Sequence, residues 1–121
     1  MKKSILLVED DPFLIEIYSK KMAEAGFFAE VVSNGEEVLA KAKEKKPDLV
    51  ILDIVLPQVD GWEILRQIKQ DPELKNTKVV ILSNLGQKEE VEKGIESGAE
   101  KYLIKAHFTP SQVVEEIKKI I

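Results

Sequence analysis

The chain has 121 residues, a length that fits one domain with one sizeable hydrophobic core. Its composition, 44% hydrophobic and 33% charged, is that of an ordinary globular protein and excludes a disordered or fibrous one. The absence of cysteine excludes disulfides and thiolate metal sites, and a net charge of −4 without a basic block argues against direct binding of nucleic acid.

Short apolar runs alternate along the chain with segments whose apolar residues recur at helical spacing. The apolar runs predict strands at Ser4–Val8, Phe28–Val32, Leu49–Leu52, residues 78–82 and residues 102–104, of which the first is expected to be buried and the third to be apolar on both faces. No run approaches the roughly 20 apolar residues of a membrane-spanning helix, and the first residues lack the pattern of a secretory signal. We therefore expect a cytoplasmic protein that does not enter a membrane.

A helix is predicted after each of these strands. The first begins after Asp11, an N-cap residue followed by Pro12, and ends before Gly26. Capping-box patterns at 33–36 and 60–63 open the second and third helices, residues 87–97 form the fourth, and Thr109 opens the fifth. The side chains expected to face the core are Leu14, Tyr18, Met22, Ala25, Val38, Leu39, Ala42, Ile64, Leu65, Ile68, Val113, Val114, Ile117 and Ile120.

This order of elements predicts an α/β fold. Strands that are apolar throughout, separated by amphipathic helices, indicate a parallel sheet covered on both faces. Right-handed crossovers then leave chiefly the flavodoxin-like, doubly wound (βα)5 sandwich with strand order 2-1-3-4-5. Residues 1–121 contain no linker or repeat and stop where the fifth helix should finish, so we expect a single domain with no output domain.

Polar side chains directly follow each of the predicted strands, although Ser33 and Asn34 after the second strand are expected at the sheet edge, away from the switch in strand order. Glu9 and Asp10 follow the first strand, Asp53 the third, Ser83 the fourth and Lys105 the fifth. Sheets of this type bind ligands beyond the carboxyl ends of the strands, near the switch in strand order, where the first and third strands are neighbours. The two acids of the first strand are therefore expected to converge with the aspartate of the third.

Converging carboxylates repel one another and need either a raised pKa or a cation. Two like charges about 4 Å apart cost on the order of 4 kcal/mol at a surface-like dielectric constant. Oxygen ligands favour hard divalent ions, and Mg²⁺ suits this set best because its sites keep several waters and often share a phosphate oxygen. A carboxylate nucleophile, a hydroxyl and a lysine beside such a metal are the groups that phosphoryl transfer requires.

Several short motifs lie at these strand ends in a consistent order: ILLVEDD at 5–11, PDLVILD at 47–53, Leu56-Pro57 with Asp60-Gly61, Ser83, Gly98-Ala99, and YLIK at 102–105. With these motifs the sequence resembles the receiver domains of response regulators, the chemotaxis regulators among them, over essentially its whole length. The resemblance implies a two-component signalling protein that takes a phosphoryl group from a histidine kinase or a phosphotransfer protein. It implies a phosphoacceptor that assists its own phosphorylation and slow dephosphorylation, not an enzyme.

The resemblance also implies roles for individual residues. Asp53 is the expected phosphoacceptor and a ligand of Mg²⁺, with Mn²⁺ as an alternative ion. Asp10 is expected to bind the metal directly, Glu9 mostly through water, and Val55 through its backbone carbonyl.

The remaining roles concern the response to phosphorylation. Ser83 is expected to hydrogen-bond the phosphoryl group and Lys105 to pair with it. Tyr102, which could equally be a half-buried strand residue, is expected to turn inward as Ser83 moves. The surface formed by the fourth helix, fifth strand and fifth helix would then change and signal to a protein target that the sequence does not identify. The chain is expected to be a monomer or a phosphorylation-dependent homodimer through this surface.

Other residues near the motifs have a simpler structural interpretation. Asp11, which precedes Pro12, is expected to cap a helix rather than to bind metal. Phe13 and Trp62 are expected to pack in the core or at its rim. His107, the one histidine of the chain, is expected to be a solvated loop residue.

Two features depart from the family pattern. Most receivers carry proline after the lysine, whereas Ala106 follows Lys105 here. Because a cis bond before a non-proline residue costs about 2.5–4 kcal/mol, we predict a trans bond and a shifted loop over 105–108. Asn84 stands where a small residue is usual, and with Leu85 it is expected at the mouth of the site, where both bear on the dephosphorylation rate.

Three other functions remain open from the sequence. A pseudo-receiver, an interaction module that no longer uses phosphate, is consistent with Ala106. An aspartyl-phosphate hydrolase would carry a second aspartate two residues after Asp53, where Val55 stands. A flavin-binding protein of the same fold is disfavoured because the acidic loop after the first strand cannot cradle phosphate without a metal.

Overall fold

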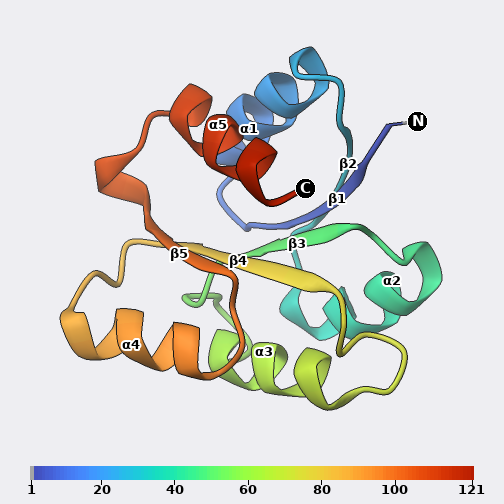
Figure 1. Ribbon diagram of the computed structural model, residues 1–121, viewed down its shortest axis with the longest axis vertical. Coiled ribbons are helices and arrows are strands. Elements are labelled where there is room, and N and C mark those ends of the chain that lie inside the picture. The colour runs from blue at the N-terminus through green and yellow to red at the C-terminus, as the bar shows by residue number, and fades with distance from the viewer. Residues whose placement is uncertain (1) are drawn as a thin grey trace.

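The structure, a computed structural model that describes residues 2–121, is built around a five-stranded parallel sheet (Figure 1). The strand order is β2-β1-β3-β4-β5, which confirms the flavodoxin-like topology predicted from the sequence. The strands are β1 (Ser4–Val8), β2 (Phe28–Val32), β3 (Leu49–Leu52), β4 (Lys78–Ser83) and β5 (Lys101–Ile104). The helices are α1 (Pro12–Glu24), α2 (Val38–Lys45), α3 (Gly61–Gln70), α4 (Lys88–Glu96) and α5 (Pro110–Ile120), with short 3₁₀ turns η1 (Gly35–Glu37) and η2 (Lys105–His107).

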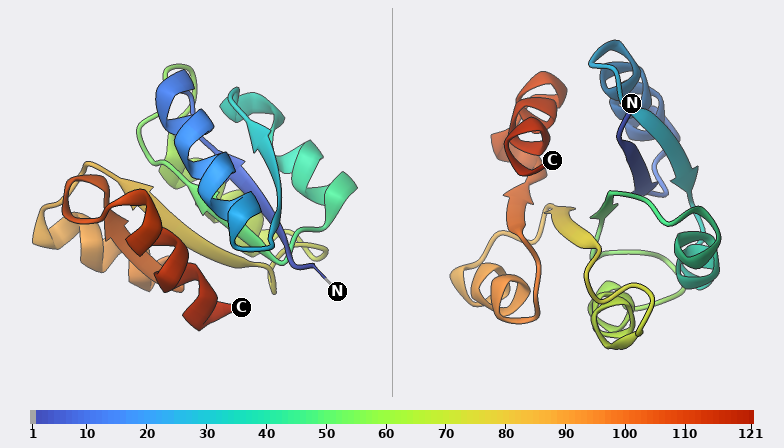
Figure 2. Two further views of the ribbon diagram at one scale, coloured as in Figure 1. Left: turned by 90° about the horizontal axis from the view of Figure 1, so that it is seen from above. Right: turned by 45° about the vertical axis from the view of Figure 1, so that its right-hand side comes forward.

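The helices cover both faces of the sheet. Helices α1 and α5 lie on one face, and α2, α3 and α4 lie on the other (Figures 1 and 2). The central strand β3 is buried along its whole length and divides its side chains between the two layers. Leu49 and Ile51 pack toward α1 and α5, whereas Val50 and Leu52 pack toward α2 and α3. The alternation explains why the strand is apolar at every position.

The predicted inward faces of the helices are largely confirmed. Most of the side chains are buried, and the half-buried exceptions are Leu14, Ala25, Leu39 and Ile120. Two strands are slightly longer than predicted. Strand β4 includes Ser83 because it pairs with Ile104, and β5 begins at Lys101 because it pairs with Val80. Within residues 2–121, no helix is long and apolar enough to cross a membrane.

Two of the predicted helix starts are confirmed in detail. The Asp11 carboxylate accepts hydrogen bonds from the backbone amides of Phe13 and Leu14, and Pro12 is the first residue of α1. Thr109 and Gln112 form a reciprocal capping box at the start of α5. Both helices therefore satisfy backbone donors that would otherwise lack partners.

Two predicted capping boxes are wrong. At residues 33–36 the cap is the Asn34 side chain, which accepts from the amide of Glu36 and opens the turn η1, so α2 itself begins only at Val38. At α3, Asp60 accepts from the amide of Trp62 as expected. The carboxylate of Glu63 does not complete that box, because it pairs with the Arg66 side chain one helical turn along.

A tight return after β3 holds the loop that follows Asp53. Residues Val55 and Asp60 form an isolated antiparallel bridge, and the amide of Gly61 donates to the carbonyl of Ile54 over 3.1 Å. A Cβ atom at Gly61 would lie 2.4 Å from the Cα atom of Ile54 and 2.5 Å from its carbonyl oxygen. Only glycine fits here, because backbone atoms cannot move aside as a flexible side chain can.

We predict that Gly61→Ala lowers the free energy of unfolding by about 1–3 kcal/mol, as overpacking against a rigid neighbour does. Urea denaturation measures the change. Gly86→Ala is the matched control, since its nearest contacts would all be with the Ile104 side chain, at 3.2 Å or more, and its effect should stay within about 0.5 kcal/mol. Equal denaturation midpoints for the two variants would contradict this account of Gly61.

Candidate functional site

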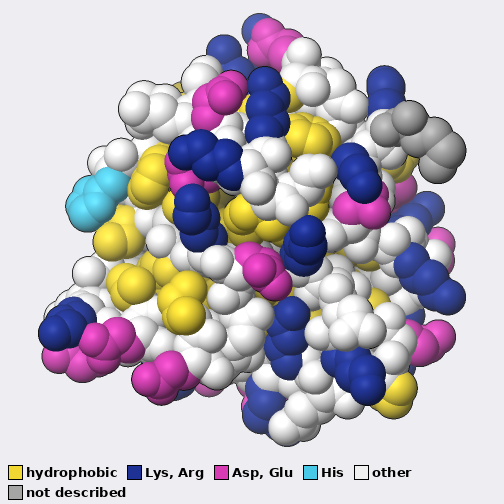
Figure 3. Space-filling view, in the orientation of Figure 1, with side chains coloured by type: hydrophobic (Ala, Val, Ile, Leu, Met, Phe, Trp, Pro, Cys, Tyr) yellow, Lys and Arg dark blue, Asp and Glu magenta, His cyan; other side chains and the backbone are white. Residues whose placement is uncertain are grey.

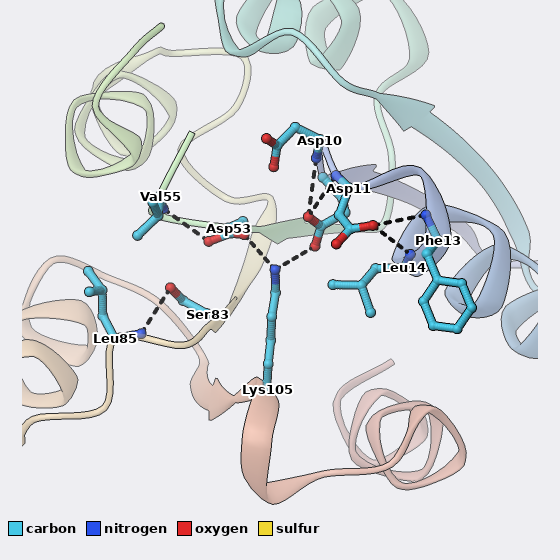
Figure 4. A network of polar contacts seen from close by, with 10 residues as sticks. Asp10, Asp11, Phe13, Leu14, Asp53, Val55, Ser83, Leu85 and Lys105 are labelled. Atoms are coloured by element: carbon cyan, nitrogen blue, oxygen red, sulfur yellow. Dashed lines mark hydrogen bonds and ion pairs between the residues drawn. The ribbon is translucent and has the colours of Figure 1, made fainter. Parts of the chain in front are cut away.

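The predicted polar residues meet at the carboxyl-terminal edge of the sheet (Figure 4). In the parallel register, Val8 of β1 lies opposite Leu52 of β3, so the residues that follow them, Glu9 and Asp53, are neighbours. The backbone amide of Glu9 donates to Val32, and that of Asp53 donates to Val8. Both acids therefore leave the sheet from positions that the strand ladder still holds.

Three carboxylates form a cluster at this edge. Glu9, Asp10 and Asp53 each offer an oxygen, and these oxygens lie within 4.8 Å of one another. Glu9 is 1% exposed and Asp53 is 5% exposed, whereas Asp10 is exposed. The convergence predicted from the sequence is confirmed, and two of its three members are withdrawn from water.

One oxygen of each buried acid is held by the backbone. Glu9 Oε2 accepts from the amides of Asp10 and Asp11, each over 3.2 Å. Asp53 Oδ1 accepts from the amide of Val55 over 3.0 Å. These bonds fix the two carboxylates in orientation and offset part of the cost of burying them.

The other oxygen of each buried acid is held by Lys105. Its ammonium Nζ lies 2.7 Å from Glu9 Oε1. It lies 2.6 Å from Asp53 Oδ2, and Figure 4 draws this contact as a dashed line. Burial raises the pKa of Glu9, although the lysine opposes that rise. Burial alone would lower the pKa of Lys105, but the hydrogen bonds with the two acids outweigh it and raise the pKa above its ordinary value. The lysine therefore stays charged at neutral pH.

The cluster fits a hard divalent cation. The three acids line a cleft of about 380 Å³, together with Asp11, Leu14, Val55, Asn84, Leu85 and Lys105. Its oxygen donors are carboxylates from two adjacent strand ends, and the chain contains no cysteine. All-oxygen donor sets of this kind suit Mg²⁺ or Mn²⁺.

A second polar network begins at Ser83, which is fully buried at the end of β4. Its Oγ atom accepts a hydrogen bond from the amide of Leu85 over 3.3 Å. The hydroxyl of Tyr102 donates to the carbonyl of the same leucine. Burial raises the pKa of Tyr102, so its hydroxyl stays protonated and able to donate. The sequence predicts Leu85 only at the mouth of the site, because both of its hydrogen bonds are made by backbone atoms, which no side-chain pattern reports.

The peptide bond after Lys105 has the predicted geometry. No peptide bond among residues 2–121 is cis, so the bond to Ala106 is trans as predicted. Residues Lys105–His107 form the turn η2, which the amide of Phe108 closes on the carbonyl of Lys105. His107 is exposed, as expected for a solvated loop residue.

The aromatic residues near the site have different environments. Trp62 is half-buried and packs at the rim of the core, as predicted, with the Lys93 ammonium 4.4 Å from its ring centroid. The prediction for Phe13 is wrong, because this side chain is 69% exposed. Asp11 accepts hydrogen bonds from amides in the first turn of α1, so it caps that helix as predicted.

Comparison with known proteins gives a consistent result. Residues 5–118 match the family described as the response regulator receiver domain. The chain is 36% identical to chemotaxis protein CheY of Thermotoga maritima, covering 99% of this chain and 98% of that protein. It is 35% identical to the alkaline phosphatase synthesis transcriptional regulatory protein PhoP of Bacillus subtilis, covering 100% of this chain but 49% of PhoP. The chain thus spans about half the length of that relative.

Solved structures agree in fold. A chemotaxis protein of Vibrio cholerae superposes with a TM-score of 0.91 at 25% identity over 100% of both chains. The BeF₃-activated DrrB receiver domain gives 0.85 at 33% identity, covering 98% of this chain and 97% of that one. The Mn²⁺-bound form of response regulator Rcp1 gives 0.81 at 28% identity, covering 97% and 92%. The chain belongs to the receiver domain family of two-component response regulators.

Proposed function

We propose that the protein accepts a phosphoryl group on the carboxylate of Asp53, in a Mg²⁺-dependent reaction with a histidine kinase or a phosphotransfer protein. The observation that carries this proposal is the pairing of a buried, backbone-oriented Asp53 with the ammonium of Lys105 beside two further acids. The protein is a phosphoacceptor that assists its own modification rather than an enzyme acting on a separate substrate.

The proposed transfer is an in-line displacement at phosphorus. An oxygen of Asp53 attacks the phosphorus of a phosphohistidine, so that an O–P bond forms while the N–P bond breaks and its electron pair stays with the histidine. Lys105 exchanges its contact with the Asp53 carboxylate for one with the phosphoryl oxygens. Positioning and charge neutralisation account for most catalysis of this kind, and a lysine held 2.6 Å from the nucleophile is suited to both.

The residues that would hold the metal can be distinguished by their surroundings. Asp10 is exposed at the cleft, which suits direct binding with Asp53 and the backbone carbonyl of Val55. Glu9 already accepts two amides and the lysine, which suits contact through water. A bound Mg²⁺, or Mn²⁺ as in the Rcp1 structure, would supply charge neutralisation for the carboxylates and the incoming phosphoryl oxygens.

The proposed response begins at Ser83. Because its Oγ atom accepts from the Leu85 amide, the hydroxyl proton remains to donate to a phosphoryl oxygen. A movement of Ser83 toward that oxygen would pull on Leu85 and, through its carbonyl, on Tyr102. The surface of α4, β5 and α5 would change and serve a protein target or a second copy of the chain.

The charge of the surface bears on which kind of partner the protein binds. Figure 3 shows acidic and basic side chains interspersed over the face seen in Figure 1, in a chain of net charge −4. Such a surface lacks the clustered positive charge that drives nucleic-acid binding. We therefore propose protein partners for this chain, in the cytoplasm where histidine kinases present their phosphoryl groups.

We predict that the protein gains one phosphoryl group from a small-molecule phosphodonor with Mg²⁺, and that Asp53→Asn gains none, because an amide is not a nucleophile here. Intact-mass spectrometry with and without EDTA measures the gain. Asp60→Asn is the matched control, since asparagine also caps a helix and Asp60 lies outside the carboxylate cluster. The control should gain phosphate as the wild type does.

Failure of the wild type to gain phosphate under any donor would sink the proposal. It would favour instead an interaction module of the same fold that no longer uses phosphate. A gain that persists in Asp53→Asn would move the acceptor to another residue.

We further predict that Lys105→Met binds Mg²⁺ at least about tenfold more tightly than the wild type, a change of roughly 1.4 kcal/mol. The ammonium now neutralises Glu9 and Asp53, and its removal leaves them with uncompensated charge that a cation would relieve. Isothermal titration calorimetry measures the affinity. Lys101→Met, which removes a lysine paired with Glu116 instead, should leave it unchanged. Equal affinities in wild type and Lys105→Met would show that the lysine does not compete with the metal.

A further inference from the structure

Gly94 occupies an unusual position in α4. It is the one buried residue of a helix that otherwise presents half-buried and exposed side chains. Glycine in a helix interior is less favourable than alanine, so its presence indicates a packing requirement. A Cβ atom here would lie 2.7 Å from Tyr102 Cδ2 and 2.8 Å from Ile81 Cδ1. The missing side chain thus leaves space that the tyrosine ring fills.

The ring in this space is connected to the phosphoacceptor site. Tyr102 donates its hydroxyl proton to the carbonyl of Leu85, and the amide of Leu85 donates to Ser83 Oγ. Leu85 also lines the cleft that contains Asp53. A continuous set of contacts therefore runs from α4 through the tyrosine to the end of β4.

The two neighbours of the missing Cβ atom would respond differently to a methyl group. Ile81 Cδ1 is the end of a flexible chain and can rotate, whereas Cδ2 belongs to a rigid ring that moves as a whole. The ring has a way out, because Tyr102 is half-buried and β5 is an edge strand. Leaving this space would separate its hydroxyl from Leu85.

We propose that Gly94 is a positioning residue for Tyr102: by lacking a side chain it creates the space that keeps the ring inward and its hydroxyl bonded to Leu85. The link to switching rests on the proposed function, whereas the position of the ring does not. Gly94→Ala then shifts Tyr102 outward and uncouples α4 from Ser83, without touching the group that accepts phosphate.

The ring position is tested by ¹⁹F NMR of protein labelled with 3-fluorotyrosine, in a Tyr18→Phe background so that Tyr102 gives the single signal. In the parent this signal is expected to differ from that of solvated 3-fluorotyrosine, and in Gly94→Ala to move to the solvated value. The same shift is expected when Gly94→Ala is combined with Ile81→Val, which removes the other close atom. An unmoved signal in Gly94→Ala, or restoration of the parent signal by Ile81→Val, would overturn the proposal.

A double-mutant cycle keeps the test decisive if Gly94→Ala folds poorly. Tyr102→Val removes the ring atoms that the new methyl group would meet. Gly94→Ala should therefore lower the thermal midpoint in the wild-type background and should not lower it in the Tyr102→Val background. Equal losses in both backgrounds would mean that the tyrosine is not what the glycine accommodates.

The consequence for switching is read separately. Gly94→Ala should still gain one phosphoryl group on Asp53, while its apparent affinity for beryllium trifluoride with Mg²⁺ falls roughly fivefold or more, because the inward state has become rarer. An unchanged affinity with an outward ring would overturn the coupling. If the wild type takes up no phosphate yet the ring moves in Gly94→Ala, the proposed function fails and the positioning role stands.

Discussion

The structure depends above all on the need to neutralise carboxylates gathered at one edge of the sheet. Glu9 and Asp53 are almost fully buried and lie beside Asp10. In each buried acid one oxygen accepts from the backbone and the other contacts the ammonium of Lys105, so all four oxygens have partners. A buried charge without such partners would cost several kcal/mol. The fifth strand must therefore end where its lysine can reach the first and third strands.

The strand order of the sheet is what brings the acids and the lysine close enough to neutralise one another. Parallel strands bring all their carboxyl ends to one edge, and the order β2-β1-β3-β4-β5 makes the strands that carry the acids neighbours. The lysine follows the edge strand β5 and reaches past the end of β4 to Asp53. The last residue of β4, Ser83, is fully buried. Glu9, Asp53 and Lys105 thus connect strands on both sides of the switch in strand order. A change at Asp53 can therefore affect the ends of several strands.

Much of this arrangement could be predicted from the sequence, because strand ends in a parallel sheet are set by apolar periodicity and by the residues that follow each run. Asp53, Glu9 and Lys105 were found in this way. The features that were missed depend on geometry that no residue pattern encodes. Glu63 matched a capping box but pairs with Arg66, since a nearby guanidinium competes for its carboxylate. Leu85 connects Ser83 to Tyr102 through two hydrogen bonds of its backbone. Backbone bonds do not depend on the type of side chain, so only the structure shows this connection.

The magnitude of these contacts limits how the proposed switch can work. One hydrogen bond such as that between Tyr102 and Leu85 contributes about 0.5–1.5 kcal/mol net, enough to change a population ratio by roughly twofold to twelvefold. Converting a mostly inactive protein into a mostly active one needs about 5.5 kcal/mol of differential binding. Tyr102 and Gly94 therefore supply only a small part of the free energy that the proposed switch requires. In the proposed mechanism the larger contribution comes from charge, because Lys105 would exchange its contact with the Asp53 carboxylate for one with a phosphoryl group that carries more negative charge.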